Sequence, residues 1–269
     1  MEAYKYQKID YMNLFSLKGK VCVVSGVANR YGIGAAYACA LASAGADLVL
    51  VDKNEGFLEE NAEHARAYGV RVYTKLCDIS DHASVEELLA FTLEKFGKVD
   101  VLVNNAARFH GDPFEDIKPE DWKSVMDINV TGNFNMAQVF GREMIRQGIK
   151  GSIIFTSSKS GIVPDYPNKQ AAYNCSKAAI IMMAKSLAAE WSAYGIRANC
   201  IAPGNMLTDN VKERIESNDP MIETWSKLNP MNRFGATSEL CGALLFFASD
   251  ASTYTTGETI RCDGGYCII

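Results

Sequence analysis

The chain has 269 residues, of which 48% are hydrophobic and 22% charged, with 21 glycines and only 7 prolines. This is the composition of a globular protein with a sizeable core, and it excludes the disordered and fibrous classes. A net charge of -5, with basic residues scattered along the chain, argues against a nucleic-acid partner.

The start of the chain carries charged and aromatic residues and lacks both an apolar core segment and a small-residue cleavage site. Nowhere do 18 apolar residues follow one another. We therefore expect a cytoplasmic protein without a membrane span, folded as a single domain over residues 1–269, in which residues 1–17 form an N-terminal extension. No C-x-x-C pair and no zinc spacing of histidines occurs, so we expect reduced thiols and no metal site.

Short apolar runs alternate with helical patterns along the whole chain. The runs are rich in β-branched residues and apolar on both faces, which is typical of parallel strands covered by helices on each side. Strands are predicted over 21–25, 48–52, 70–76, 99–104, 152–157, 197–201 and 258–262, and helices over 34–44, 55–68, 84–96, 121–147, 171–194 and 238–249. This pattern predicts an α/β fold: one doubly wound, mostly parallel seven-stranded sheet with helices on both faces.

One stretch departs from this alternation. Residues 204–235 contain Asn, Asp and Pro interruptions between amphipathic pieces at 211–216 and 222–228. A helical segment that covers a substrate pocket would have this pattern, and an ordinary surface excursion would have it equally.

A glycine-rich turn, SGVANRYGIG at residues 25–34, lies between the first strand and the first helix. Backbone N–H groups in such a turn approach a pyrophosphate closely, and the positive end of the helix dipole points at it. The predicted cofactor contacts in this turn are Gly26, Asn29, Tyr31, Gly32, Ile33 and Gly34.

Asp52 ends the second strand, 20 residues after Gly32. A carboxylate there accepts hydrogen bonds from the adenosine ribose hydroxyls and repels a 2′-phosphate, which favours NAD over NADP. Arg30 and Lys53 are basic groups nearby that leave NADP open as the less favoured cofactor.

Tyr173 and Lys177 lie four residues apart at the start of a predicted helix, so their side chains share one face. A phenol that works near neutral pH needs its pKa lowered by about 2 to 3 units from about 10, which Lys177 and an oxidised nicotinamide together could supply. Ser157 and Ser158 end the preceding strand, and Asn129 lies in the long helix before it.

Taken together, these motifs resemble the short-chain dehydrogenase/reductase family over residues 17–266. Its landmarks follow in order: the glycine turn, Asp78, the NNAA of residues 104–107, the NVTG of 129–132, Ser158, Tyr173 with Lys177, the PG of 203–204 and the DGG of 263–265. The resemblance implies a Rossmann-type fold and nicotinamide-dependent oxidoreduction.

The resemblance also implies roles for individual residues. Ser158 would hydrogen-bond the substrate oxygen, Tyr173 would be the acid/base, Lys177 would bind the nicotinamide ribose and lower the tyrosine pKa, and Asn129 would hold a water in a proton relay. Further cofactor contacts would be Cys77, Asp78, Ile79, Asn105, Ala106, Ala107, Pro203, Gly204, Met206 and Thr208.

The chain departs from the usual family pattern in three places. The glycine turn is two residues longer, Ala107 stands where glycine is common, and the interval from Ser158 to Tyr173 is two residues longer. The last departure leaves Ser157 open as the catalytic serine.

Polar residues around the predicted pocket favour a polyhydroxylated substrate, and we expect Ser158, Lys159, Tyr166 and Asn205 to contact it. The runs at residues 12–20 and 263–266 look similar to the polyol and sugar-acid dehydrogenase branch. We therefore predict oxidation of a secondary hydroxyl of a sugar, polyol or sugar acid. The alternatives are an NADPH-dependent 3-oxoacyl thioester reductase and a catalytically inactive cofactor-binding regulatory protein. The helix near 178–191 has a broad apolar surface, and its counterpart in the family that the chain resembles packs across subunits, so we predict a homotetramer.

Overall fold

The computed structural model describes residues 9–268 of the chain. Residues 1–8 of the predicted N-terminal extension therefore lie outside the described residues. From residue 9 onward the chain makes a 3-10 turn at Asn13–Phe15 and then buries Leu17 fully, immediately before the first strand.

Between residues 9 and 268, seven parallel strands form one sheet in the order β3-β2-β1-β4-β5-β6-β7. The strand bounds are β1 (Val21–Ser25), β2 (Asp47–Asp52), β3 (Val72–Leu76), β4 (Val101–Asn104), β5 (Ser152–Thr156), β6 (Arg197–Pro203) and β7 (Thr259–Cys262). The predicted sheet is confirmed. Because the strand order reverses between β1 and β4, a crevice is expected at the carboxyl ends of these two strands.

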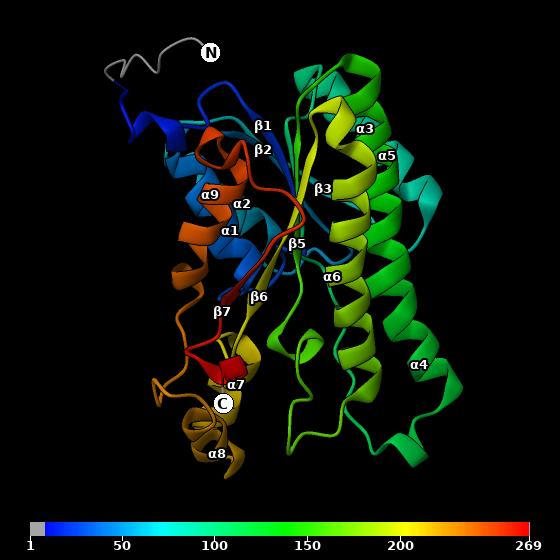
Figure 1. Ribbon diagram of the computed structural model, residues 1–269, viewed down its shortest axis with the longest axis vertical. Helices are drawn as coiled ribbons and strands as arrows, with labels where there is room; N and C mark the ends of the chain where they lie inside the picture. Colours follow the sequence, from blue (N-terminus) through cyan, green and yellow to red (C-terminus); the bar gives the residue numbers. More distant parts are fainter. Residues whose placement is uncertain (1–8, 269) are drawn as a thin grey trace, which may run out of the picture.

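Helices cover both faces of the sheet (Figure 1). Their bounds are α1 (Ile33–Ser43), α2 (Leu58–Arg66), α3 (His82–Phe96), α4 (Pro119–Met126), α5 (Asn133–Gln147), α6 (Ala171–Trp191), α7 (Asp209–Glu216), α8 (Met221–Lys227) and α9 (Cys241–Ala248). Helices α1, α2 and α9 pack on one face, whereas α3, α5 and α6 pack on the other.

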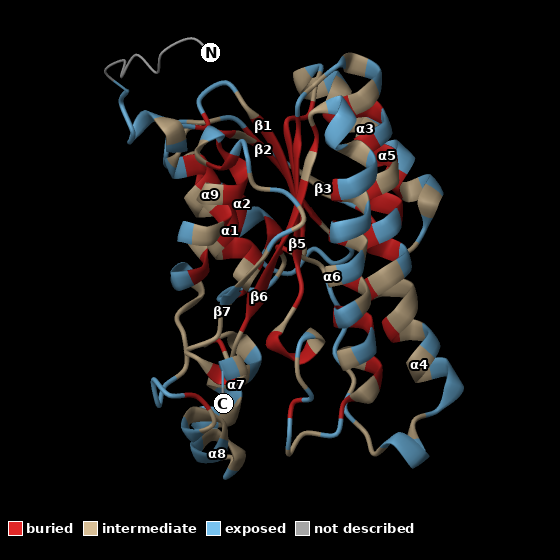
Figure 2. Ribbon diagram, viewed as in Figure 1, coloured by how far each residue is buried: buried red, intermediate tan, exposed pale blue. Residues whose placement is uncertain are grey.

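The sheet separates two apolar cores. Val24 of β1 packs into one of them with Leu41 of α1, and its neighbour Val23 packs into the other with Phe140 of α5. The central strands β1, β4 and β5 are therefore buried on both faces (Figure 2). This burial explains why the strand sequences are continuously apolar rather than alternating.

The long helix predicted over 121–147 is interrupted. α4 and α5 are joined by a π-helical segment, Asp127–Gly132, that contains Asn129. Such segments insert a wider turn into a helix and frequently occur at functional sites. The predicted helix at 238–249 likewise begins as a 3-10 turn, Thr237–Leu240, before α9.

Residues 204–235 form the predicted helical excursion, with α7 and α8 beyond the carboxyl end of the sheet (Figure 1). Every residue of both helices is at least partly exposed. This segment therefore contributes little to the core and is expected to be among the least stable parts of the fold.

The described residues also bear on membranes, metals and disulfides. None of the helices between residues 9 and 268 is long and apolar enough to cross a membrane. In the same part of the chain, no group of three or more His, Cys, Asp or Glu side chains is placed to hold a metal ion. All eight cysteines are free thiols.

Candidate active site

Two adjoining clefts open at the carboxyl ends of the strands. The first, about 810 Å³ in volume, lies over β1 to β4, and the second, about 550 Å³, lies between β5, β6 and the α7–α8 segment. Phe109, Tyr173 and Thr208 line both clefts. The tyrosine that the sequence singles out therefore stands where the two clefts meet.

The glycine turn forms the floor of the first cleft. Gly26 has a φ of +75°, and a Cβ atom on it would lie 2.7 Å from the Cα atom of Ala106. A Cβ atom on Gly34 would lie 2.2 Å from the carbonyl oxygen of Gly26. Gly32 precedes α1 without a side chain to cap it, so the positive end of α1 meets this cleft. These features fit the pyrophosphate of a dinucleotide.

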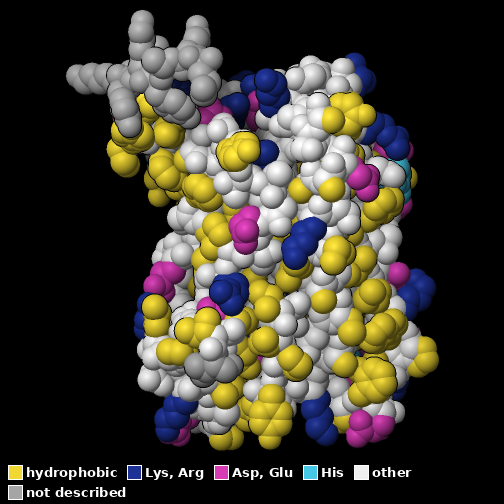
Figure 3. Space-filling model, in the orientation of Figure 1, with side chains coloured by type: hydrophobic (Ala, Val, Ile, Leu, Met, Phe, Trp, Pro, Cys, Tyr) yellow, Lys and Arg dark blue, Asp and Glu magenta, His cyan; other side chains and the backbone are white. Residues whose placement is uncertain are grey.

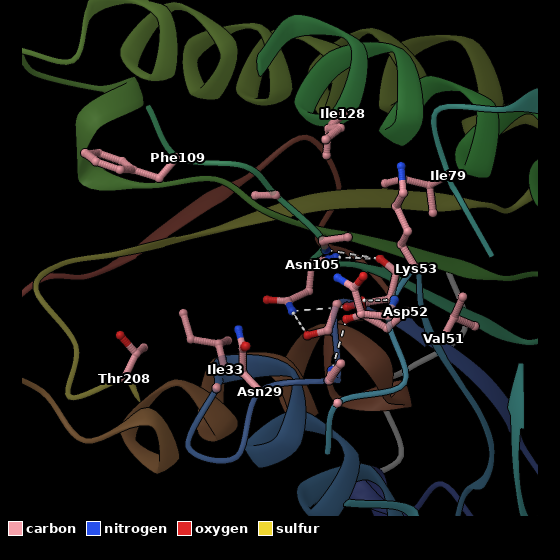
Figure 4. A pocket seen from close by; sticks show the side chains of 18 of the residues that line it. Asn29, Ile33, Val51, Asp52, Lys53, Ile79, Asn105, Phe109, Ile128 and Thr208 are labelled. Atoms are coloured by element: carbon pink, nitrogen blue, oxygen red, sulfur yellow. Dashed lines mark hydrogen bonds between the residues drawn. The ribbon is translucent and has the colours of Figure 1, made fainter. Parts of the chain in front are cut away.

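Asp52 projects from the end of β2 into the same cleft (Figure 4). Its Oδ2 atom accepts a hydrogen bond from the backbone N–H of Ala28 at 3.0 Å, and its Oδ1 atom accepts one from Asn54 N–H at 3.1 Å. The carboxylate is thus fixed at the edge where an adenosine ribose would lie.

The two basic residues that left NADP open are both paired with carboxylates. Lys53 Nζ lies 2.5 Å from Asp78 Oδ2, and Arg30 Nε lies 3.5 Å from Glu60 Oε1. Although burial raises the pKa of Asp78, hydrogen bonds from Lys53 and Ser80 outweigh it and lower that pKa. Lys53 is therefore already engaged with an ionised partner.

The ends of β1 and β4 are tied together beside the glycine turn. Asn105 Nδ2 donates to the carbonyl oxygens of Ser25 (3.1 Å) and Gly26 (3.0 Å), and Ser25 Oγ accepts from the N–H of Ala106 at 3.2 Å. This clamp fixes the distance between the turn and the opposite wall of the cleft.

Ser158 and Tyr173 meet in the second cleft. Tyr173 lies in the first turn of α6, and Ser158 follows β5 in extended conformation. Both line the second cleft, and the Ser158 hydroxyl lies close enough to the phenol to lower its pKa. Ser157 Oγ instead donates to the carbonyl oxygen of Lys177 at 2.7 Å. The geometry therefore favours Ser158 over Ser157 as the partner of Tyr173.

The electrostatics of the pair differ from the prediction. Burial raises the pKa of Tyr173 to about 12, although the hydrogen bond with Ser158 lowers it. Burial also lowers the pKa of Lys177 to about 8. Lys177 Nζ donates to the carbonyl oxygen of Thr156 at 2.8 Å and lies 5.5 Å from the centre of the Tyr173 ring. Within the protein alone, burial thus outweighs the hydrogen bond with Ser158, and Lys177 is not among the groups that lower the pKa of Tyr173.

Asn129 is fully buried, and its side-chain amide is occupied by protein groups. Oδ1 accepts from Arg108 N–H at 2.7 Å, while Nδ2 donates to Arg108 O and to Ser176 Oγ, both at 2.9 Å. The amide thus joins the loop after β4 to α6. The predicted water relay at Asn129 stays a prediction, because the described contacts involve protein groups.

The predicted substrate residues separate into three groups. Ser158 and Asn205 line the second cleft, and Asn205 Nδ2 donates to the carbonyl oxygen of Trp225 at 3.2 Å. Lys159 also lines it, but its ammonium is buried in an ion pair with Asp165. Tyr166 is 79% exposed and lies outside the lining of either cleft. The structure therefore does not bring Tyr166 to the site.

Most of the predicted cofactor residues line one of the two clefts. The first cleft is lined by Gly26, Asn29, Gly32, Ile33, Asp52, Cys77, Asp78, Ile79, Asn105, Ala106, Ala107, Tyr173 and Thr208, and the second by Lys177, Pro203, Gly204 and Met206. Gly34 lies beneath the turn against Gly26. Tyr31 points to the surface, where Lys212 Nζ lies 3.2 Å from its ring centre.

Several lining residues were not predicted from the sequence, among them Phe109, Trp225 and Gln170. The ring of Phe109 packs edge-on against Tyr173, with 5.4 Å between ring centres. Trp225 of α8 donates its indole N–H to Asn168 Oδ1 at 3.1 Å. Gln170 lines the second cleft immediately before α6. Each comes from a loop or a short helix, where periodicity carries little information.

Comparisons with known proteins agree with this geometry. A family model described as enoyl-(acyl carrier protein) reductase matches residues 26–267. The chain is 39% identical to an NADP-dependent mannitol dehydrogenase of Alternaria alternata, covering 97% of each chain. It belongs to the short-chain dehydrogenase/reductase family. It is also 36% identical to a ribulose-forming D-arabinitol 2-dehydrogenase of Scheffersomyces stipitis, covering 97% of this chain and 98% of that one.

A solved structure of NAD⁺-bound xylitol dehydrogenase superposes on this short-chain dehydrogenase/reductase with a TM-score of 0.86 and 33% identity, covering 93% of this chain and 99% of that one. The predicted family and reaction class are therefore confirmed: the protein is an oxidoreductase that acts on CH–OH groups with a nicotinamide cofactor. The mannitol relative is named for NADP and the xylitol structure for NAD⁺. Family membership therefore does not decide between NAD and NADP, and the choice has to be argued from the residues of this chain.

Proposed function

We propose that the protein is an NAD-dependent dehydrogenase that interconverts a secondary hydroxyl of a polyol, sugar or sugar acid and the corresponding ketone. The observation that carries the proposal is the pairing of the Ser158 and Tyr173 hydroxyls in the second cleft, with Lys177 one helical turn onward. The relatives named as mannitol and arabinitol dehydrogenases support the substrate class.

In the proposed reaction the phenol of Tyr173 moves the proton of the substrate hydroxyl. In oxidation the deprotonated Tyr173 oxygen accepts that proton and becomes the phenol, and in reduction the phenol donates the proton and becomes the phenolate, while Ser158 hydrogen-bonds the same substrate oxygen. A bound oxidised nicotinamide would accept the hydride from the carbinol carbon and add positive charge beside the phenol. The ammonium of Lys177, which donates to the carbonyl oxygen of Thr156, lies 5.5 Å from the centre of the Tyr173 ring and adds positive charge near it.

Asp52 supports NAD as the cofactor. Its two carboxylate oxygens are fixed by backbone N–H groups, and the neighbouring Lys53 is paired with Asp78. A 2′-phosphate placed here would meet an ionised carboxylate without a free cation from either Lys53 or Arg30. We therefore propose NAD over NADP.

The proposal is tested by measuring turnover of a panel of polyols, sugars and sugar acids with NAD and with NADP, alongside reduction of a 3-oxoacyl thioester. We expect oxidation of at least one polyol with NAD. Tyr173→Phe should abolish turnover and leave NAD binding in place, measured by fluorescence titration. Rapid reduction of the thioester with no activity on any alcohol would refute the substrate class, and full activity of Tyr173→Phe would refute the site.

We also propose a homotetramer assembled through the helical layer of α4, α5 and α6. Met182 of α6 is 61% exposed and Phe134 of α5 is 45% exposed. Hydrophobic side chains gather over this side of the molecule (Figure 3). Contact between copies would remove these side chains from water. A monomeric mass by light scattering would contradict the proposal.

A further inference from the structure

A buried ion pair lies beside the catalytic hydroxyls and plays no part in the mechanism above. Lys159 is 2% exposed and Asp165 is 6% exposed, and Lys159 Nζ contacts Asp165 Oδ1. The hydroxyl of Tyr266 donates to the same Oδ1 atom at 3.0 Å, and Lys159 Nζ lies 3.8 Å from the centre of the Tyr266 ring. A lysine six residues earlier in the chain and a tyrosine of the C-terminal segment thus fix this carboxylate in place.

The other carboxylate oxygen of Asp165 leads to Ser158. Ser160 Oγ lies 3.4 Å from Asp165 Oδ2, and Ser158 Oγ lies 3.2 Å from Ser160 Oγ. Ser158 Oγ also accepts the N–H of Ser160 at 3.1 Å, and Gln170 Nε2 donates to Ser160 Oγ at 3.2 Å. A continuous hydrogen-bonded chain therefore runs from the ion pair to the hydroxyl that contacts Tyr173.

The direction of this chain matters for Ser158. Because Asp165 Oδ2 can only accept when ionised, the Ser160 hydroxyl donates to it and its lone pairs are left for Ser158 and Gln170. The Ser158 hydroxyl contacts that same Ser160 oxygen, so its orientation depends on how Asp165 holds Ser160. An ionised Asp165 thereby restricts the orientation of the Ser158 hydroxyl beside Tyr173.

The ion pair also lies within electrostatic reach of Tyr173, since the negative charge of Asp165 raises the pKa of that phenol. Other charged or titratable groups around the two sites are Lys177 on α6, Lys159 after β5, and Tyr266, Cys267 and Asp263 in the C-terminal segment. Asp112, Lys169 and Arg214 line the same cleft. Lys159 offsets the charge of Asp165 at direct contact. The net field at Tyr173 therefore depends on both partners being present.

We propose that Asp165, held by Lys159 and Tyr266, is a positioning residue that orients the Ser158 hydroxyl and that the Lys159–Asp165 pair sets the pH range in which Tyr173 accepts a proton. This inference rests on the proposed function. Asp165 lies in the segment between Ser158 and Tyr173, which is two residues longer than usual in the family. In this proposal, that segment brings a carboxylate close to Ser158.

The test is the pH profile of kcat for polyol oxidation at saturating NAD and polyol. Asp165→Asn removes the negative charge, so the rising limb should move to lower pH by about half a unit or more. Lys159→Met leaves the carboxylate unopposed, so the limb should move to higher pH. If the substitutions only disturbed packing, both variants would lose activity, but their rising limbs would not move in opposite directions.

The double variant Lys159→Met/Asp165→Asn should return the limb close to that of the unaltered protein. If the single variant Lys159→Met does not fold, the double variant is compared with Asp165→Asn instead. The rising limb of the double variant must then lie at higher pH than that of Asp165→Asn. The same substitutions in the exposed pair formed by Lys123 of α4 and Asp127, the residue after it, are the matched control and should leave the profile unchanged.

Two failures can be told apart. If Tyr173→Phe is inactive but neither single variant moves the limb, or both move it the same way, the role of the ion pair is wrong and the proposed function stands. If Tyr173→Phe retains turnover, the proposed function itself is wrong. Opposite shifts in the two single variants, cancelling in the double variant, would support the inference.

Discussion

The carboxylate of Asp209, the first residue of α7, accepts the backbone N–H of Tyr31 in the glycine turn, at 3.2 Å from Oδ1 and 3.0 Å from Oδ2. Lys212, one turn further along α7, places its ammonium over the ring of the same tyrosine. The longer glycine turn thus attaches to the segment 204–235 through Tyr31, which points away from the first cleft.

Loss of this attachment should loosen the α7–α8 segment. Asp209→Ala removes a hydrogen bond with a charged acceptor, worth about 1 kcal/mol at a partly exposed site. We expect the KM for the polyol to rise roughly fivefold, with a smaller change in kcat, and limited proteolysis within residues 204–235 to speed up. Glu216→Gln on the exposed side of the same helix is the control. An unchanged polyol KM together with a lower KM for NAD would contradict an attachment role.

Cofactor choice should depend on Asp52. Asp52→Ser removes the carboxylate that we propose to meet the ribose, so the ratio of kcat/KM with NAD to that with NADP should fall at least tenfold, about 1.4 kcal/mol. Asp47→Ser at the opposite end of β2, where Asp47 pairs with Arg71 on the surface, should leave the ratio unchanged. An unaltered ratio in Asp52→Ser would show that cofactor choice has another origin.

The strands were predictable because their signal is local. The run 21–25 is the strand β1 itself, and the burial of Val23 and Val24 in opposite cores is what makes the run apolar throughout. Tyr173 and Lys177 were equally accessible to sequence reasoning, since a helix places residues four apart on one face.

The polar contacts of the site were not predictable in the same way, because they join residues far apart in sequence. Lys159 was expected to contact the substrate, but its ammonium is neutralised by Asp165, and Tyr266 completes the set from 101 residues beyond Asp165. Tyr166 stood beside these residues in the sequence and yet points outward. Side-chain direction in an irregular loop depends on tertiary contacts rather than on spacing.

The glycine turn offers a comparison between two glycines with left-handed backbone. Gly26 and Gly69 have φ values of +75° and +82°, but an added Cβ atom would meet Ala106 only in the first case, and nothing within 4 Å in the second. Gly69→Ala should therefore lower the free energy of unfolding by about 1 kcal/mol, the cost of the backbone conformation. Gly26→Ala should lower it further and also weaken NAD binding, measured by denaturant unfolding and fluorescence titration. Equal losses in both variants would contradict the close approach of the turn to Ala106.

Burial of Lys177 predicts a conflict between stability and activity. Its pKa is about 8 in the folded protein, against a usual value of 10.5, so below pH 8 the folded state holds a charge that burial disfavours, by about 3 kcal/mol. In the unfolded chain the lysine keeps its proton up to about pH 10.5, so stability from this group rises with pH between 8 and 10.5.

Lys177→Met should remove that cost and lose one hydrogen bond to the carbonyl oxygen of Thr156, which is worth about 1 kcal/mol. We therefore expect the variant to gain about 1 to 2 kcal/mol in free energy of unfolding at pH 7, and the gain to disappear between pH 8 and 10.5, while turnover falls at least about 100-fold. Lys185→Met on the outer face of the same helix is the control for replacing a lysine by methionine. If Lys177→Met is less stable than the unaltered protein at pH 7, interactions in the folded state offset the cost of burying the ammonium. Lys177 would then not lower the free energy of unfolding.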